Sequence, residues 1–322
     1  MRPSQSGIYG GLRLLERVRG EMKKVDTESA LLGEVGSPLF LKGCEFIYNW
    51  PFSFGVLRAF LTTPRDKWIR DVLLWLEIQR LTLPKGACFG MMRMLENHDV
   101  FKSVRFYGIG PMKALFALCS LAQGVPFVFN EQEAEFEDFM GRLLRLRRAL
   151  PEIARGDLAA KSRDPEVMVF VCKLDGRRFS VVAINFASER REARISVDLD
   201  AIGAPPGRLV LYKAIKGRSL GGVKAGRGLD ISLDLSPFGC EVVVVRPEKE
   251  TLPPILSVKG RKALKVKKGF LSVERLRGSR IKVSNAYYEM VLRGGLVEHL
   301  TPRGSEVALV EGMELTEGKR KI

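Results

Sequence analysis

The sequence predicts an α/β fold followed by all-β structure, and three observations support this division. Up to about residue 158, short apolar runs alternate with segments of helical spacing, an order typical of parallel sheets. In residues 159–247 apolar and polar residues alternate along short runs separated by turns, which predicts antiparallel strands. After a linker that ends with two adjacent prolines, residues 255–322 predict a further, basic module rich in β-structure.

The first part contains four predicted strands and four predicted helices in alternation. The strands cover residues 30–35, 45–49, 89–95 and 126–129, and the helices cover residues 12–22, 66–81, 111–121 and 136–144. Polar residues follow the strands, among them Glu34, Asn49 and the segment 97–99. In barrels of alternating strands and helices the functional groups lie at these strand ends. The strand ends are therefore the first place to look for a site.

The second part reads as an antiparallel β-sandwich. Its predicted strands cover residues 167–171, 179–184, 193–199, 209–212 and 240–245, with turn residues such as Asp175 and Gly176 between them. Residues 281–284, 287–292 and 296–300 predict further strands in the basic module. An all-β second half excludes one continuous barrel along the whole chain.

Composition and charge exclude several classes of protein. The chain has 322 residues, 46% of them hydrophobic, enough for more than one core, and its best apolar stretch, 114–129, is interrupted by Gln, Gly and Pro, so no membrane partner is expected. Five scattered cysteines and two histidines predict neither disulfides nor a zinc site. The N-terminal residues are not a secretory signal, so the cytoplasm is favoured, although a signal peptide could lie upstream.

The net charge of +16 raises the alternative of nucleic-acid binding. Residues 251–322 hold 15 Lys and Arg against 7 Asp and Glu. In 259–268 and 275–282 these positive residues alternate with apolar ones, as on the wet face of a strand. No nucleic-acid motif accompanies them, so no nucleic-acid partner is predicted. A true nucleic-acid binder would show affinity that falls steeply with salt.

Glu34 and the sequence Asn97-His98-Asp99 are the candidates for chemistry. Cleavage of a glycosidic bond needs carboxyl groups on both sides of the bond, one of which donates a proton to the leaving oxygen. A lone Glu at a strand end is more often a salt-bridge partner, and a His-Asp pair in a loop is more often a turn. Their occurrence together, in order, at the ends of two of the predicted strands favours the catalytic interpretation.

These segments resemble the α-amylase family of retaining glycosidases and transglycosylases, glycoside hydrolase family 13, over residues 12–245. Residues 14–35 (LLERVRGEMKKVDTESALLGEV) are similar to the helix and fifth barrel strand that carry the general acid/base. Residues 94–105 (MLENHDVFKSVR) resemble the Asn-His-Asp motif of the seventh strand, and residues 124–133 (GVPFVFNEQE) resemble the eighth strand. Residues 139–157 (FMGRLLRLRRALPEIARGD) are similar to the last barrel helix.

The resemblance implies the C-terminal half of a (β/α)8 barrel, strands five to eight, in residues 1–158, followed by a β-sandwich C-domain in residues 159–247. It implies action on α-glucans by a retaining mechanism. Glu34 would be the general acid/base, and Asp99 would be the carboxylate that holds a sugar hydroxyl and stabilises the transition state. The substrate-binding residues would be His98, Asn97 and Arg105. Calcium binding is also implied, with ligands mostly upstream, and no other cofactor is predicted.

One departure from the family pattern shapes the functional expectation. The family nucleophile is an Asp that should lie upstream of the first helix, yet residues 1–13 contain no Asp, and Asp26 lies in the loop before the first strand. We therefore expect an N-terminally truncated, inactive fragment whose partners are an α-glucan and the missing half of the barrel. The alternative is a non-catalytic, amylase-like protein that binds carbohydrate or another protein. For Trp50, Phe52 and Phe54, sugar stacking and core packing are equally favoured.

Overall fold

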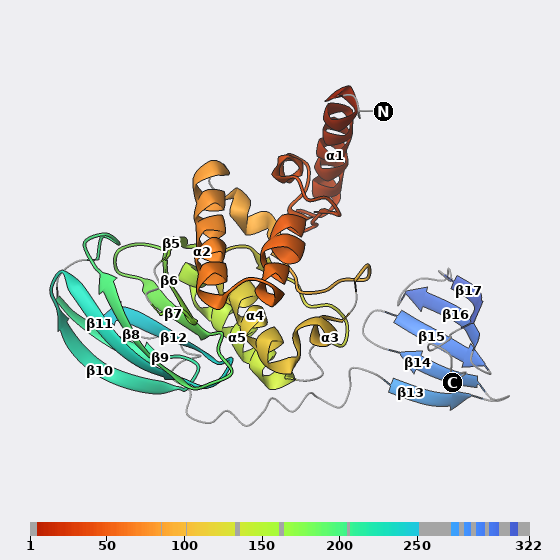
Figure 1. The fold of residues 1–322 in the computed structure, drawn as a ribbon. Helices are drawn as coiled ribbons and strands as arrows, with labels where there is room; N and C mark the ends of the chain where they lie inside the picture. Colours follow the sequence, from red (N-terminus) through yellow and green to blue (C-terminus); the bar gives the residue numbers. More distant parts are fainter. Residues whose placement is uncertain are drawn as a thin grey trace. The chain divides into compact units, whose positions relative to one another are not determined.

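The computed structural model of the chain divides into two compact units, Met1–Ser257 and Val258–Ile322 (Figure 1). The first unit combines helices with one parallel and two antiparallel sheets, and the second contains one antiparallel sheet among its described residues. No helix in the described part of the chain is long and apolar enough to cross a membrane. The structure describes residues 5–84, 86–100, 102–132, 136–160, 164–204, 207–250, 272–276, 280–284, 288–293, 296–302 and 310–314.

A four-stranded parallel sheet lies in the N-terminal part of the first unit. Its strands are β1 (Leu32–Gly33), β2 (Phe46–Tyr48), β3 (Met91–Arg93) and β4 (Val125–Pro126). They lie side by side in the order of the sequence, and every neighbouring pair is parallel. Parallel strands joined by crossover connections have their C-terminal ends at one edge of the sheet. The segments that follow β1 to β4 therefore start from the same edge, as the alternating pattern predicts.

The strands of this sheet are shorter than the apolar runs that predict them. The run 30–35 contains the two-residue strand β1, and the run 126–129 contains only the last residue of β4. Pairing continues past the strand bounds at single residues: the Phe127 N–H donates to the Arg93 carbonyl at 2.8 Å, and the Leu31 carbonyl accepts from the N–H groups of Glu45 and Phe46. Leu31 and Val35 pack against the cluster around Ile47, and Phe127 packs against the cluster around Tyr48. Packing thus extends beyond the strands, although Leu32 and Val128 of the same runs are exposed.

Helices connect the parallel strands and pack against the sheets. The α-helices are α1 (Gln5–Val25), α2 (Arg65–Thr82), α3 (Ser103–Tyr107), α4 (Ile109–Leu121), α5 (Glu137–Ala149) and α6 (Pro151–Arg155). Shorter helical turns are η1 (Pro38–Lys42), the π-helix η2 (Pro51–Val56), η3 (Arg58–Leu61) and η4 (Ala87–Gly90). Between α4 and β4, Gly124 has a φ of +115°, and a Cβ there would lie 2.6 Å from the carbonyl oxygen of Met91. Only glycine fits this turn.

Two antiparallel sheets follow in the same unit. Their strands are β5 (Asp157–Ala160), β6 (Val167–Lys173), β7 (Phe179–Asn185), β8 (Arg191–Asp198), β9 (Gly207–Lys213), β10 (Arg218–Ala225), β11 (Gly228–Leu235) and β12 (Cys240–Pro247). Six of them form one sheet in the order β10-β9-β12-β7-β6-β5, and β8 pairs with β11 in a separate sheet. The antiparallel pairing agrees with the period-two pattern of the sequence.

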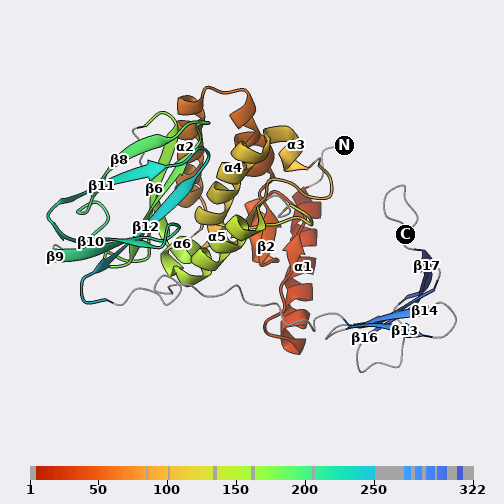
Figure 2. The same cartoon turned by 90° about the horizontal axis from the view of Figure 1, so that it is seen from below.

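The centre of the six-stranded sheet is buried on both faces. One face, which includes Val181 and Val243, shares an apolar cluster with β8 and β11. The opposite face, which includes Val182 and Val244, shares a cluster with α2, α4 and α5 (Figure 2). For this reason β7 is buried at every residue, whereas β8 alternates between buried and exposed positions. The helices and the sheet thus have a common core. The domain boundary between residues 158 and 159 stays a prediction.

The second unit contains five antiparallel strands in sequence order. They are β13 (Ser272–Leu276), β14 (Arg280–Ser284), β15 (Tyr288–Arg293), β16 (Leu296–Pro302) and β17 (Val310–Glu314). Along β14 the basic residues Arg280 and Lys282 alternate with Ile281 and Val283, which agrees with the strand pattern predicted there. The basic run 259–268 and the end of the predicted linker, residues 251–254, lie outside the described residues.

Candidate functional site

The candidate site lies at the C-terminal edge of the parallel sheet. Glu34 directly follows β1, which pairs with β2 through Gly33 and Ile47. His98 and Asp99 lie in the loop between β3 and α3. Since β1, β2 and β3 are consecutive parallel neighbours, the sheet brings these two segments, distant in the sequence, to the same edge.

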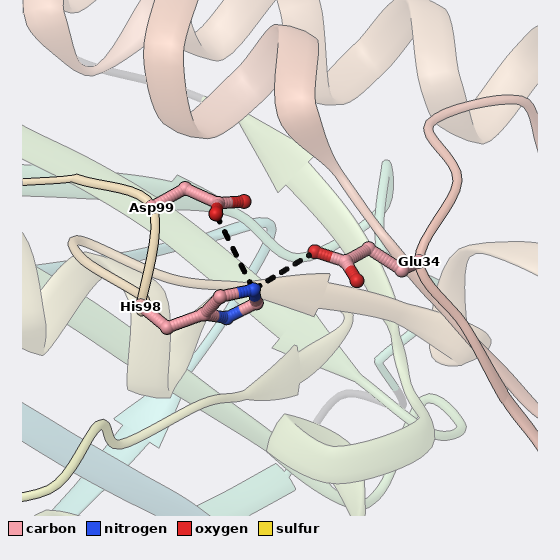
Figure 3. Close-up of side chains that lie close together, drawn as sticks. All are labelled: Glu34, His98 and Asp99. Atoms are coloured by element: carbon pink, nitrogen blue, oxygen red, sulfur yellow. Dashed lines mark ion pairs between the residues drawn. The ribbon is translucent and has the colours of Figure 1, made fainter.

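Glu34, His98 and Asp99 approach one another at this edge (Figure 3). The Nε2 atom of His98 is 3.5 Å from Oε1 of Glu34 and 3.3 Å from Oδ1 of Asp99. All three side chains are about half exposed to solvent. The imidazole therefore lies between two carboxylates, in a position that a ligand can reach from solvent.

Tyr48 of β2 lies next to the two carboxylates. Burial is the main cause that raises the pKa of its phenol, and the negative charges of Glu34 and Asp99 raise it further. Its ring makes edge-to-face contacts with Trp50, at 5.3 Å between centroids, and with Phe127, at 6.1 Å. Since even an ordinary phenol, with a pKa of about 10, keeps its proton at neutral pH, Tyr48 is a neutral polar group beside the two acids.

The three aromatic residues after β2 have different environments. Phe52 is fully buried in the main core, where the guanidinium of Arg93 lies 4.2 Å from the centre of its ring. Trp50 and Phe54 are partly buried and pack against each other at 4.9 Å between centroids. The core interpretation is therefore confirmed for Phe52, whereas Trp50 and Phe54 keep some exposed surface near the site.

The two remaining predicted binding residues are not equivalent. Asn97 is buried, and its Oδ1 accepts a hydrogen bond of 3.1 Å from the main-chain N–H of Asp99. Arg105 is exposed on α3, and the described contacts do not connect it with Glu34, His98 or Asp99. Asn97 thus shapes the loop that carries His98 and Asp99.

Three residues near the site were not among the sequence candidates: Tyr48, Glu96 and Lys102. Tyr48 belongs to a buried strand and looks like core in the sequence. Glu96 directly precedes the Asn97-His98-Asp99 motif, so its position in the sequence could have identified it as a neighbour of the site. Lys102 contacts Asn130 and Glu131, which come from a loop that only the fold brings close. No sequence pattern points to that contact.

The side chains of Glu34, His98 and Asp99 are also the one group found among the described residues that could hold a metal ion. The ligand atoms of Glu34, His98 and Asp99 all lie within 4.8 Å of one another. Calcium, which the family resemblance implies, takes six to eight oxygen ligands. Two exposed carboxylates and an imidazole do not fit that requirement. Nothing in the site described above depends on a metal.

The cysteines are all free and buried. Burial raises the pKa of Cys119, Cys172 and Cys240 to about 12. Nucleophilic chemistry requires the thiolate, which these environments disfavour. The cysteines are therefore buried residues in environments that disfavour the thiolate.

Comparisons with known proteins show the class of fold. No protein-family model and no curated protein matches the sequence. Among solved structures, an α-amylase from Anoxybacillus matches with a TM-score of 0.57 and 18% identity, over 74% of this chain and 57% of that one. An α-amylase from Geobacillus thermoleovorans, complexed with acarbose, matches with a TM-score of 0.58 and 19% identity over the same shares.

A maltogenic α-amylase from Thermotoga neapolitana is similar, with a TM-score of 0.57 and 17% identity, over 72% of this chain and 58% of that one. The fold is thus that of α-amylases, and the resemblance predicted from the sequence is confirmed at the level of the fold. The chain spans about 57% of the length of the first two α-amylases, a coverage consistent with the C-terminal part of such an enzyme.

Proposed function

We propose that the chain is the acid/base half of an α-amylase-like glycosidase or transglycosylase that acts on α-glucans with retention of configuration. The observation that carries this proposal is the meeting of Glu34, His98 and Asp99 at the C-terminal edge of a parallel sheet. In folds of alternating strands and helices, this edge is where catalytic residues lie. The α-amylase fold of the neighbours supports the same class of reaction.

Each of the three side chains has one role in this proposal. Glu34 donates a proton to the leaving glycosidic oxygen and, in the second step, accepts one from the incoming water or sugar hydroxyl. Asp99 accepts a hydrogen bond from a sugar hydroxyl, and its charge stabilises the positive charge that develops at the anomeric carbon. His98, between the two, donates a hydrogen bond to the same sugar ring. Asn97 supports this loop, and Arg105 would reach a longer substrate from α3.

The retaining mechanism needs a second carboxylate as nucleophile, about 5–5.5 Å from the acid/base. We assign this group to a complementary half-barrel that pairs with the outer edges of β1 and β4. The support is that β1 and β4 end the four-stranded sheet, while a closed barrel has eight strands. The complementary half would also cover the partly buried aromatic residues Trp50 and Phe127.

The test is to co-express the chain with an upstream amylase-type half-barrel and to measure maltooligosaccharide cleavage and its stereochemistry by NMR. We expect cleavage with retention, and Glu34→Gln should lower the rate by roughly 10²–10⁴-fold because the proton donor is lost. Glu28→Gln, an exposed Glu on the segment before β1, is the matched control and should keep full activity.

Acarbose, the ligand of the Geobacillus α-amylase complex, is the binding probe. Acarbose binding with no turnover in the assembled protein would favour the non-catalytic, sugar-binding alternative. Inverted stereochemistry, or full activity of Glu34→Gln, would refute the proposed mechanism.

A further inference from the structure

Glu96 closes the loop that carries His98 and Asp99. Its side chain is 1% exposed, and its Oε2 accepts hydrogen bonds from both the main-chain N–H and the hydroxyl of Ser103, the latter at 2.6 Å. Ser103 is the first residue of α3 and is itself fully buried. The two ends of the segment 96–103 are therefore held together by one carboxylate.

A second set of hydrogen bonds shapes the interior of this loop. The Oδ1 atom of Asn97 accepts from the main-chain N–H of Asp99 at 3.1 Å, and the Asn97 carbonyl accepts from the N–H of Val100 at 3.4 Å. His98 and Asp99 thus lie on a turn whose base is closed by Glu96.

Lys102 connects this loop with the segment after β4. Its Nζ is 3.7 Å from Oε1 of Glu96, donates a hydrogen bond of 2.6 Å to the carbonyl of Asn130, and lies 3.6 Å from Glu131. Gln132 adds a second connection, since its amide nitrogen donates to the Ser103 hydroxyl at 3.5 Å. The loops after two neighbouring strands are joined around the Glu96 carboxylate.

The Glu96 carboxylate has an ion-pair partner in Lys102 but an incomplete set of hydrogen bonds. The Oε1 atom of Glu96 is buried and lacks a hydrogen bond among the described residues. Burying a charged group whose hydrogen bonds are incomplete costs free energy. We propose that Glu96 is a positioning residue: its charge fixes the loop so that His98 and Asp99 meet Glu34.

Hydrogen exchange tests this role, because it separates local from global opening. In Glu96→Gln, the amides of Asp99, Val100 and Ser103 should exchange roughly 10- to 100-fold faster, since a charge-assisted hydrogen bond is lost. The amides of β7 and β12 should keep their exchange rates. Ser103→Ala, which removes only the hydroxyl, should give a smaller increase at the same amides and serves as the variant that leaves the charge in place.

The chain offers a matched control in Glu241. It is also 1% exposed, its Oε1 accepts from the main-chain N–H groups of Ile215 and Val242, and its Oε2 has no partner among the described residues. Glu241→Gln should change exchange around β9 and β12 and leave the 96–103 loop unchanged. An equal change of the loop in both variants, or no local change in Glu96→Gln, would overturn the inference.

The consequence for sugar binding rests on the proposed function. In the assembled protein, Glu96→Gln should weaken acarbose binding by about 10-fold through misplacement of Asp99 and His98, while Glu241→Gln leaves it unchanged. If the unsubstituted assembly does not bind acarbose, the proposed function fails, and the loop exchange still decides the role of Glu96. Loop loosening without weaker acarbose binding would refute the positioning role for substrate.

Discussion

The parallel sheet and the six-stranded antiparallel sheet of the first unit each carry a cluster of ionisable side chains, one exposed and one buried. At the edge of the parallel sheet, Glu34, His98 and Asp99 are about half exposed, and the imidazole of His98 lies 3.5 Å from Glu34 and 3.3 Å from Asp99. Beside the antiparallel sheet, Glu152 and Arg246 form a buried ion pair of 2.5 Å.

The surroundings of the two clusters explain the difference. The Glu152 Oε1 atom also accepts a hydrogen bond of 2.7 Å from the buried Ser180 hydroxyl, so the pair has fixed partners and no access to solvent. Breaking such a pair leaves an uncompensated buried charge. The exposed cluster loses little when its contacts change. Its side chains are therefore open to solvent, while the buried pair is structural.

The largest expected effect concerns the completeness of the parallel sheet. Without a complementary half-barrel, the chain should cleave maltooligosaccharides at least ~10⁴-fold more slowly than the assembled protein, because the proposed function assigns the nucleophile to that other half. The unpaired edges of β1 and β4 should also promote self-association of the isolated chain. Turnover assays and light scattering on the chain with and without the half-barrel measure both effects.

Robust activity of a monodisperse, isolated chain would contradict this prediction. It would also show that a carboxylate within the described or undescribed part of the chain acts as nucleophile. Activity and self-association are measured in the same samples. A lower turnover rate can then be distinguished from a lower amount of soluble protein.

The fold was largely predictable because its pattern is periodic. The run 66–81 predicts α2, and the antiparallel strands follow from alternation, as in the buried and exposed residues of β8. The ends of the short parallel strands were not predictable, since pairing of β1 stops at Gly33 although the apolar run continues. Helix α1 is longer than predicted, because only residues 12–22 carry the apolar spacing.

The site was predictable only where a motif carries it. Glu34, His98 and Asp99 lie at predicted strand ends, and the parallel order brings them together. The contact of Lys102 with Asn130 depends on two loops that are distant in the sequence. The raised pKa of Tyr48 depends on burial inside the sheet. Such three-dimensional features have no local pattern in the sequence.

The second effect concerns stability and contrasts the two clusters directly. Arg246→Met should lower the free energy of unfolding by about 3–5 kcal/mol, because Glu152 then remains buried without its cation. His98→Ala should lower it by less than about 1 kcal/mol, because the exposed contacts contribute little. Urea unfolding of both variants measures the difference. Equal losses in the two variants would show that the edge cluster is as structural as the buried pair.

The smallest effect concerns Tyr48, where the two kinds of environment meet. Burial raises the pKa of this phenol first, and the charges of Glu34 and Asp99 raise it further. Glu34→Gln removes one of these charges, so the pKa of Tyr48 should fall and yet stay above its ordinary value of about 10, because burial remains. An NMR titration of ¹³C-labelled tyrosine measures this pKa. Asp99→Asn should act in the same direction, and Glu28→Gln should have no effect.

The sign of the linked stability change follows from the raised pKa of Tyr48. The unfolded phenol loses its proton near pH 10, whereas the folded phenol keeps it to higher pH. This contribution to stability is therefore complete below about pH 10 and is lost as the pH rises through the folded pKa. In Tyr48→Phe the alkaline loss of stability should be smaller than in the unsubstituted chain when urea unfolding is compared between about pH 9 and pH 11. If Glu34→Gln leaves the Tyr48 titration unchanged, the carboxylate does not act on the phenol. Burial alone would then account for the raised pKa of Tyr48.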